Sequence, residues 1–373
     1  MSDDAVVSLE NVDVHFENRR STLDLFGESE TVHAVDDTTL EIPENEVVAV
    51  IGESGCGKTT LGKTAIGLQR PTAGTVRFRG QDVWDAKDGK GDVDISYDEI
   101  RRSLQIIHQD PGSSLNPNQT VMATLLQPLK RWQKDLPRRQ KEARILGLLE
   151  EVGMTPPDDY AYRYPHQLSG GEQQRTALVR ALLMEPDLIL ADEAVSALDV
   201  SLRVEMMDLM LELQNQFDTS FLFISHNLSN ARYLAGQSGG RLAIMYLGEI
   251  VEVGPCEEVL ADPQHPYTKV LKWATPDMAV KHGAIEDPPV RGVDIPDPAN
   301  PPSGCRFHTR CSEARAHCQR DAPPAYEGGD GREVRCYRVD DDSAYWNSDP
   351  LPDETDGDLL SEETDLDAGG EWA

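Results

Sequence analysis

Three short apolar runs recur along the chain, and each ends at a polar residue or a glycine. They span residues 47–51, 188–191 and 221–224 and consist of Val, Ile, Leu, Phe and Ala. Unbroken runs of this length are typical of strands that are buried on both faces in a parallel sheet. A segment with apolar residues at helical spacing, 200–217, lies between the last two runs, so the pattern predicts an α/β fold.

The first part of the chain has a different pattern. Residues 6–16 alternate between apolar and polar side chains, and 38–42 form a second predicted strand before a turn. Residues 17–31 are mostly polar, and we expect them to form an inserted loop. Further along, apolar residues between 120 and 153 recur at helical spacing, which predicts a helical subdomain.

A glycine-rich stretch follows the first buried run and precedes a helix predicted at 60–68. It fits the pattern G-x-x-x-x-G-K-[ST], in which backbone N–H groups close on phosphate oxygens and the lysine reaches the terminal phosphates. The hydroxyl of Thr59 would hold Mg²⁺, and the alternative is a glycine-rich turn before an ordinary helix. The stretch consists of Gly52, Glu53, Ser54, Gly55, Cys56, Gly57, Lys58, Thr59 and Thr60.

Polar side chains with catalytic chemistry follow other predicted strands. Asp192 and Glu193 end the second apolar run, at the edge where open α/β sheets bind ligands. Asp192 can hold Mg²⁺ through water, and Glu193 can orient or deprotonate an attacking water. His226 can contact a γ-phosphate, and Gln109 follows a strand that begins near Leu104. Each residue alone has a plain alternative, a solvated loop or a structural histidine.

Two further segments can contact a nucleotide. Ser169, Gly170 and Gly171 offer a hydroxyl and bare backbone N–H groups at the start of a helix, which would make a second anion site. A simple helix N-cap is the alternative. Phe16, at the end of the first predicted strand, offers a flat face on which adenine can stack, unless its ring fills the core.

In order and spacing, these segments resemble the ATP-binding subunit of ABC transporters. The resemblance gives ATP and Mg²⁺ as ligands, with Lys58, Gln109, Glu193 and His226 in catalysis and Gln109 beside the metal. The family's motifs correspond to the phosphate loop at 52–60, the Q-loop glutamine Gln109, the signature sequence at 168–173, the magnesium aspartate Asp192, the catalytic glutamate Glu193, the D-loop at 196–199 with Asp199, and the switch histidine His226.

Other segments resemble the oligopeptide and dipeptide (peptide/nickel) importer branch of this family. The resemblance covers about residues 6–339. Ala194 departs from it, because the family usually has proline there, and so does the glycine-rich 237–240, but neither removes a catalytic group. The branch features are Gln-Asp-Pro-Gly-Ser-Ser-Leu-Asn-Pro at 109–117, Tyr-Pro-His at 164–166, Met-Tyr-Leu-Gly-Glu-Ile-Val-Glu at 245–252 and His-Pro-Tyr-Thr at 265–268.

The resemblance implies a P-loop NTPase fold of the ABC type, with a RecA-like core, an antiparallel β subdomain and a helical subdomain. A small cysteine-containing extension follows. The implied boundaries are 1–262 for the ABC ATPase domain, about 112–175 for its helical subdomain, 263–339 for the extension and 340–373 for an acidic tail that we expect to be disordered.

The resemblance also implies partners. Two ATPase subunits pack head to tail, so that Ser169 and Gly171 of one complete the ATP site of the other, and the second subunit is expected to be a different chain. The pair would drive two transmembrane permease subunits, docked near Gln109 and the helical subdomain, at the cytoplasmic face of the membrane. A solute-binding protein would deliver oligopeptides or dipeptides from outside.

Other functions are compatible with the same motifs. Relatives in this branch take up nickel or sugars. A soluble ABC ATPase in DNA repair or translation, and a structural partner that does not hydrolyse ATP, are further alternatives. Soluble relatives usually carry two cassettes or long inserted arms, whereas this chain has one set of motifs.

Four cysteines lie close together after the ATPase motifs. Cys305, Cys311, Cys318 and Cys336 fall within 32 residues, without the C-x₂-C spacing of zinc ribbons. The segment resembles the C-terminal extension of peptide-importer ATPases, some of which carry a [4Fe-4S] cluster, and cysteine-only ligation suits such a cluster. Zinc, or free or disulfide-linked thiols, are the alternatives. Cys56 and Cys256 lie elsewhere.

The charge of the chain restricts the kinds of partner and of cellular environment that we expect for it. The net charge is −31, with 66 acidic and 35 basic residues, and the 25 Arg outnumber the 10 Lys. Such a surface suggests adaptation to a high-salt cytoplasm, where screening weakens self-repulsion. No basic cluster is available for a nucleic acid. The sequence has no apolar run long enough for a membrane span and begins without a signal-peptide pattern, so we expect a cytosolic chain.

Overall fold

Alternate residues of the first buried strand point into two different hydrophobic cores. In β3 (Val47–Ile51), the first, third and fifth residues belong to one core, and the second and fourth belong to the other. Since successive side chains of a strand point to opposite faces, β3 lies between two packed layers. The computed structural model describes residues 5–18, 30–110, 112, 115–275, 289–292 and 294–352.

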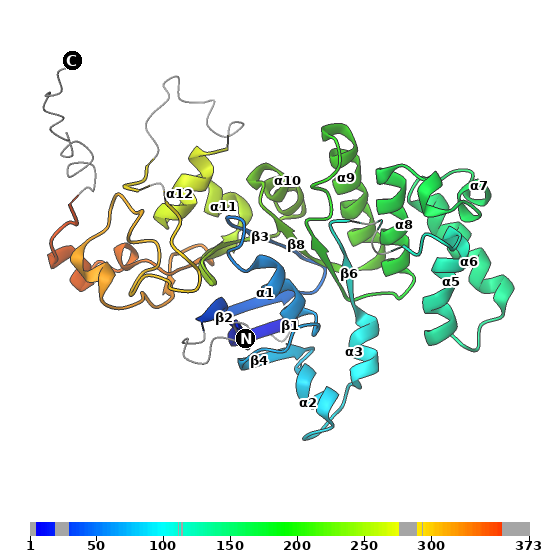
Figure 1. The fold of residues 1–373 in the computed structure, drawn as a ribbon, viewed down its shortest axis with the longest axis horizontal. Helices are drawn as coiled ribbons and strands as arrows, with labels where there is room; N and C mark the ends of the chain where they lie inside the picture. The colour runs from blue at the N-terminus through cyan, green and yellow to red at the C-terminus, as the bar shows by residue number, and fades with distance from the viewer. Residues whose placement is uncertain are drawn as a thin grey trace, which may run out of the picture.

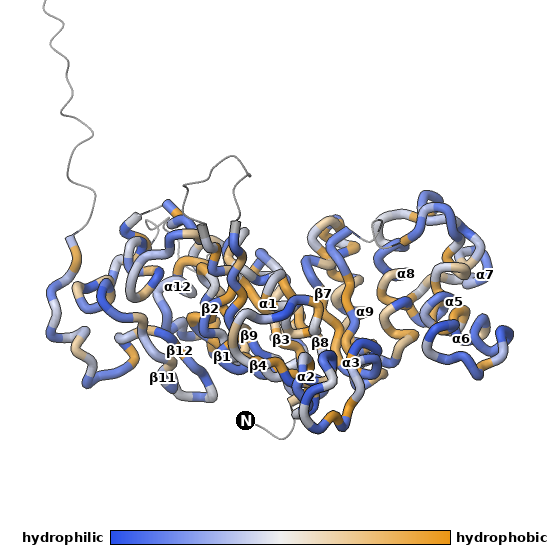
Figure 2. Tube along the Cα trace, turned by 60° about the horizontal axis from the view of Figure 1, so that its bottom comes forward, coloured by the Kyte–Doolittle hydropathy of each residue, from blue (hydrophilic) through white to orange (hydrophobic). Residues whose placement is uncertain are grey.

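Parallel strands form the middle of the larger sheet. β3 pairs in parallel with β8 (Ser220–Ser225) and with β9 (Arg241–Tyr246), and β7 (Leu188–Asp192) and β6 (Leu104–Ile107) continue beyond β8. The carboxyl ends of these strands therefore lie at one edge, and β3, β7 and β8 carry the apolar colour in Figure 2. In the described part of the chain the order is β11-β12-β10-β9-β3-β8-β7-β6, with β10 at Glu249–Pro255, β11 at Tyr326–Glu327 and β12 at Glu333–Val334.

A second, antiparallel sheet packs against α1 (Lys58–Ala65) in the other core. Its order within the described residues is β2-β1-β4-β5. The pairing of β1 with β2 continues past Phe16 and Val32 to Asn18 and Glu30, so both strands extend into the stretch predicted as a loop at 17–31, of which residues 19–29 lie outside the described ranges. The strands are β1 (Ala5–Asn18), β2 (Glu30–Pro43), β4 (Ala73–Phe78) and β5 (Gln81–Asp82).

Helices surround the larger sheet and form a lobe at one end of it. In Figure 1 the helices α5, α6 and α7 lie at one end of the molecule and the C-terminal extension at the other. Capping residues fix several starts, for example Thr120 for α5 and Ser96 for α3. The helices are α2 (Val83–Asp88), α3 (Tyr97–Ser103), α5 (Val121–Trp132), α6 (Arg138–Glu151), α7 (Pro157–Ala161), α8 (Gly170–Leu182), α9 (Val200–Phe217), α10 (Leu228–Ser238), α11 (Cys256–Ala261) and α12 (Pro266–Trp273).

The C-terminal extension is attached to the larger sheet, since β12 pairs with β10. Its chain continues past the predicted start of the tail. Residues 344–347 form the short helix η4 (Ala344–Asn347), and Tyr345 is buried and donates a hydrogen bond to the Glu313 carbonyl oxygen. The prediction of disorder from residue 340 onward is therefore wrong for 340–352, where one buried aromatic ring anchors a segment too short for apolar periodicity. Residues 353–373 lie outside the described ranges.

None of the helices in the described ranges is both long enough and apolar enough to cross a membrane.

Candidate nucleotide site and cysteine segment

The loop between β3 and α1 has the geometry that its glycines allow. Gly57, the N-cap of α1, has a φ of 108°, and a Cβ atom there would lie 1.9 Å from the carbonyl oxygen of Ala34. Lys58 is buried, and its Nζ donates to the carbonyl oxygens of Gly52 and Glu53, both at 2.8 Å. The loop thus curls around an ammonium group at a helix N-terminus, which is the arrangement that binds phosphate.

The remaining residues of the loop divide by exposure. Ser54 and Gly55 are exposed at its tip, and Thr60 is already inside α1. Cys56 is buried, and burial raises the pKa of its thiol. Its carbonyl oxygen accepts a hydrogen bond from the N–H of Gly248, which ties the loop to the turn between β9 and β10.

Thr59 and Asp192 meet at the edge of the sheet. The hydroxyl of Thr59 donates to Oδ1 of Asp192 at 2.9 Å, although 133 positions separate them in the sequence. Asp192 is the last residue of β7 and is buried. A hydroxyl beside a carboxylate, next to the phosphate loop, is a donor set that Mg²⁺ accepts. The two residues therefore fit a magnesium ion at this point.

Glu193 and His226 form a second pair at the same edge. His226 Nδ1 lies 2.9 Å from both carboxylate oxygens of Glu193. Glu193 has a φ of 52°, which turns it out of β7, and its backbone N–H donates to the carbonyl oxygen of Ile224 in β8. The imidazole is largely exposed, whereas most of the carboxylate is covered. A carboxylate held by an imidazole can orient or deprotonate water.

Gln109 follows β6 on the far side of β7. Ile107 of β6 pairs with Ala191, so the segment after β6 runs beside Asp192, and Gln109 itself is exposed. His108 is half-buried there, and burial lowers the pKa of its imidazole. The sequence gives no indication that His108 belongs to this edge, because only the pairing of β6 with β7 brings it there.

The signature residues lie at the start of α8, outside this cluster. Ser169 caps α8, because its hydroxyl accepts from the N–H of Glu172 while its own N–H donates to the Glu172 carboxylate. Ser169 and Gly170 are exposed and Gly171 is buried. Asp199 caps α9 by accepting from the Leu202 N–H. The structure therefore bears out the helix cap and leaves Ser169 and Gly170 on the surface.

Phe16 lies on β1, opposite Val32 of β2, and its exposed fraction is 43%. The alternative that this ring fills the core is therefore wrong. An exposed aromatic face on this strand is available for stacking.

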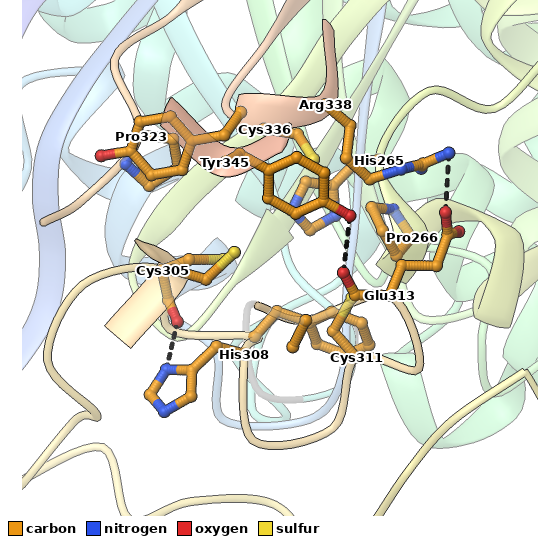
Figure 3. A pocket seen from close by; sticks show the side chains of 14 residues that line it. His265, Pro266, Cys305, His308, Cys311, Glu313, Pro323, Cys336, Arg338 and Tyr345 are labelled. Carbon is orange, nitrogen blue, oxygen red and sulfur yellow. Dashed lines mark hydrogen bonds and ion pairs between the residues drawn. The ribbon is translucent and has the colours of Figure 1, made fainter. Parts of the chain in front are cut away.

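The four cysteines of the extension share one pocket. Figure 3 shows Cys305, Cys311 and Cys336 around it, together with a hydrogen bond from His308 Nδ1 to the Cys305 carbonyl oxygen. Cys318 also lines the pocket. All four are free thiols in this structure, so the disulfide alternative is not realised, and burial raises the pKa of Cys311 to about 12 and that of Cys336 to about 11.

The shared pocket gathers the donor set that a metal group needs. All four cysteines line it, and cysteine-only ligation suits either a zinc ion or an iron–sulfur cluster.

Two residues of the C-terminal part contact the phosphate loop, and neither was predicted from sequence. Nη1 of Arg310 lies 2.9 Å from each carboxylate oxygen of Glu53, and the Glu53 N–H donates to the Tyr267 hydroxyl at 2.9 Å. More than 200 positions separate both residues from the loop, so no local pattern indicates these contacts.

Taken together, the parallel strands, the glycine loop around Lys58, the Thr59–Asp192 pair and the Glu193–His226 pair define a P-loop ATPase of the cassette type.

Comparisons with known proteins agree with this class. Residues 35–196 match the family model described as "ABC transporter", and residues 251–318 match "Oligopeptide/dipeptide transporter, C-terminal region". The chain is 39% identical over 307 residues to the oligopeptide transport ATP-binding protein AppF of Bacillus subtilis, covering 82% of this chain and 89% of that protein. It is 36% identical over 343 residues to OppF of Salmonella typhimurium, covering 90% and 96%.

Solved structures give the same fold. A dimeric ATP-binding cassette, MJ0796, bound to ADP and phosphate in a post-hydrolysis state, is 27% identical with a TM-score of 0.55, covering 67% of this chain and 98% of that one. The cbiO1 protein of Clostridium perfringens has a TM-score of 0.57 at 23% identity, covering 69% and 92%.

The chain therefore belongs to the ABC transporter family, in the branch of oligopeptide and dipeptide transport ATP-binding proteins. Like the family, it is an ATPase. The family and the ABC ATPase fold predicted from the motifs are confirmed.

Proposed function

We propose that this chain hydrolyses ATP to power an ABC importer for oligopeptides or dipeptides. The main support for ATP hydrolysis is the position of two residue pairs, Thr59–Asp192 and Glu193–His226. Both pairs lie at the edge of the larger sheet where the phosphate loop also lies. The cargo follows from the relatives, which are named as oligopeptide or dipeptide transport proteins over most of this chain. These names favour peptides over nickel or sugars, and transport over a soluble or purely structural role.

Binding of ATP uses the loop from Gly52 to Thr60. Its backbone N–H groups and the Lys58 ammonium hold the β- and γ-phosphates, and the exposed ring of Phe16 stacks on adenine. Thr59, Asp192 and Gln109 would hold a magnesium ion. Bound there, the ion would supply positive charge that stabilises the phosphate oxygens.

Hydrolysis depends on the residues beside the γ-phosphate. Glu193 accepts a proton from the attacking water or orients that water for in-line attack. His226 holds the Glu193 carboxylate and has its exposed imidazole next to the γ-phosphate position. Catalysis in this arrangement is positioning together with electrostatic stabilisation, since no covalent intermediate is required.

A single chain provides two half-sites. Ser169, Gly170 and Asp199 are assigned to the ATP that a second ATPase subunit holds, together with the N–H of Gly171. The exposure of Ser169 and Gly170, away from this chain's own phosphate loop, supports that assignment. The second subunit is a different chain of the same family, and the chain alone turns ATP over slowly.

The permease subunits dock at a groove between the core and the helical subdomain. The groove has a volume of about 680 Å³ and lies between α3, α5 and α8. Asn116, which follows the Gln109 segment, lines it, so a permease segment there would contact the loop that senses ATP. The complex lies on the cytoplasmic face of the membrane, and an external binding protein supplies the solute.

The extension holds a [4Fe-4S] cluster through Cys305, Cys311, Cys318 and Cys336. Support comes from the pocket that all four cysteines line, because cysteine-only ligation suits such a cluster. The family match covers the first three of these cysteines. The division into an ATPase domain at 1–262, a helical subdomain at about 112–175 and an extension at 263–339 belongs to the same proposal.

The acidic surface adapts the chain to a cytoplasm of high ionic strength. The net charge of −31 is the support, because self-repulsion of this size is relieved when salt screens it.

The test of hydrolysis is Glu193→Gln in the transporter purified from its own membranes. We expect turnover to fall by roughly a hundredfold or more, because the amide cannot take a proton, while ATP still binds and accumulates on the complex. Glu212→Gln, an exposed residue of α9 outside the site, is the matched control and keeps wild-type turnover. Unchanged hydrolysis in Glu193→Gln would remove the catalytic assignment and favour a structural subunit.

A further inference from the structure

Glu53 places a negative charge inside the loop that binds a triphosphate. Its backbone is fixed at two points, because its N–H donates to Tyr267 Oη and its carbonyl oxygen accepts from Lys58 Nζ. Both oxygens of its carboxylate accept from Nη1 of Arg310. An unpaired carboxylate at this position would repel the phosphates of ATP.

Arg310 is buried and enclosed by aromatic rings. Its exposed fraction is 6%, and its guanidinium carbon lies 5.6 Å from the ring centre of Phe307 and 5.8 Å from that of Tyr246. Phe307 in turn packs on Tyr246 and Tyr267 at 5.2 and 5.3 Å between ring centres. The guanidinium therefore has a fixed position, aimed at Glu53 with both Nη1 contacts at 2.9 Å.

The same turn positions Arg310 and a pocket cysteine. The carbonyl oxygen of Phe307 accepts hydrogen bonds from the N–H groups of both Arg310 and Cys311, each at 3.0 Å. Cys311 lines the pocket together with Cys305, whose N–H donates to the carbonyl oxygen of Cys318. A change in the order of the cysteine pocket therefore moves the backbone that carries the Arg310 guanidinium.

Tyr267 provides a second link from the extension. It lies in the segment His265–Thr268, which the buried carboxylate of Glu252 holds by accepting from the N–H of His265 and the hydroxyl of Thr268. This segment also borders the cysteine pocket through His265. Both residues that contact Glu53 are thus next in sequence to a residue that lines this pocket, Arg310 to Cys311 and Tyr267 to Pro266.

We propose that Arg310 is a positioning residue for the phosphate loop, through which the cysteine segment controls the ATP affinity of this chain. When the segment is ordered, Arg310 neutralises Glu53 and holds the loop in its binding form. When the segment loosens, the Glu53 carboxylate is released and ATP binds more weakly. The proposal rests on the assignment of residues 52–60 as the ATP site.

The first test measures equilibrium binding of Mg-ATP to the full chain by calorimetry. Arg310→Gln is expected to weaken binding about tenfold, because removing one partner leaves an uncompensated charge. Glu53→Gln combined with Arg310→Gln is expected to regain most of the affinity, since the repulsive charge is gone. Arg310→Lys keeps the charge without the fork and is expected to lie between wild type and Arg310→Gln.

The controls separate this effect from loss of the fold. Arg335→Gln removes another ion pair between the extension and the core, with Asp37 at 2.9 Å, and is expected to keep affinity within about twofold. Hydrogen exchange is expected to rise in the phosphate loop of Arg310→Gln and to stay unchanged in α6. Should Arg310→Gln fail to fold, the double variant and Arg310→Lys still report the charge effect. Wild-type ATP affinity in Arg310→Gln overturns the proposal, and if that variant does not fold, wild-type affinity in Arg310→Lys does so instead. A double variant that binds ATP as weakly as Arg310→Gln also overturns it.

The second test links the pocket to the loop. Cys311→Ser is expected to weaken ATP binding in the wild-type background, but to have no further effect in Arg310→Gln, because the signal passes through the guanidinium. Equal losses in both backgrounds overturn the coupling. Lys58→Ala is measured in parallel to test the proposed ATP site. If this variant still binds ATP, the assignment of residues 52–60 as the ATP site is contradicted. If it loses ATP binding, the ATP site stands and the Arg310 variants test the coupling separately.

Discussion

Gly57 illustrates how one residue can decide whether the phosphate loop closes. It combines a φ of 108° with a backbone approach that leaves no room for a Cβ atom. The sequence motif predicts a glycine there, but the structure supplies the steric reason, which is the carbonyl oxygen of Ala34 in β2. The pairs Thr59–Asp192 and Glu193–His226 also belong to the residue scale. The motifs predict each of these four residues separately, but they do not predict that the residues pair.

At Gly57, alanine is expected to reduce ATP affinity by at least about tenfold. The left-handed backbone costs roughly 1–2 kcal/mol for any residue with a Cβ atom, and the contact with Ala34 adds to that cost. Calorimetric titration with Mg-ATP measures the loss. Gly147→Ala is the matched control, because Gly147 lies inside α6 with open space around its Cβ position, and there alanine is expected to leave ATP affinity unchanged and to stabilise the helix slightly. Equal affinity in Gly57→Ala and wild type would contradict the steric argument.

At the scale of elements, four parallel strands position most of the residues of the site. They are β3, β8, β7 and β6. Each contributes the residues that follow its carboxyl end, so chemistry from four distant segments gathers at one edge. The apolar runs predict the strands. They do not predict which strands are neighbours in the sheet, and this order decides which of the proposed catalytic residues lie side by side.

The cysteine segment is the element whose chemistry is most directly measurable. Full-length chain purified without oxygen is expected to contain about four irons and four acid-labile sulfides, with visible absorbance that disappears in Cys318→Ser. Cys256→Ser is the control, because Cys256 begins α11 and does not line the pocket, and it is expected to keep the iron. One zinc per chain without iron, or colourless protein, would contradict the cluster.

At the scale of the whole molecule, charge and burial act in opposite directions. Two continuous cores on either side of the larger sheet stabilise the fold, while the net charge of −31 opposes compaction. Exposed ion pairs such as Arg232–Glu257 contribute little individually. The balance between these contributions depends on ionic strength.

Thermal unfolding of the full chain is therefore expected to depend strongly on salt. The midpoint in about 2 M KCl should exceed that in dilute buffer by at least about 5 °C, because the Debye length shrinks to a few ångströms. Circular dichroism measures the transition. A neutral osmolyte at the same osmotic strength is the control, and it should raise the midpoint less than KCl does. A midpoint independent of KCl would contradict adaptation to high salt.

The sequence by itself determined the class of this protein and the types of the residues proposed for catalysis. Motifs such as 52–60 and 168–173 carry their chemistry locally, since a glycine loop or a helix cap needs only a few consecutive residues. Apolar periodicity likewise predicted the buried strands and the helical subdomain. The order of residues 340–352 was missed, because a single buried ring, Tyr345, leaves no periodic signal.

Only the tertiary structure decided which of these residues meet. The contacts of Glu53 with Arg310 and Tyr267 join segments more than 200 positions apart, and the exposure of Phe16 depends on how β1 pairs with β2. Such contacts arise from strand order and from packing of the extension against the sheet, and neither is encoded in a local pattern. The physical reason is that burial and charge compensation are properties of a place in the fold rather than of a position in the chain.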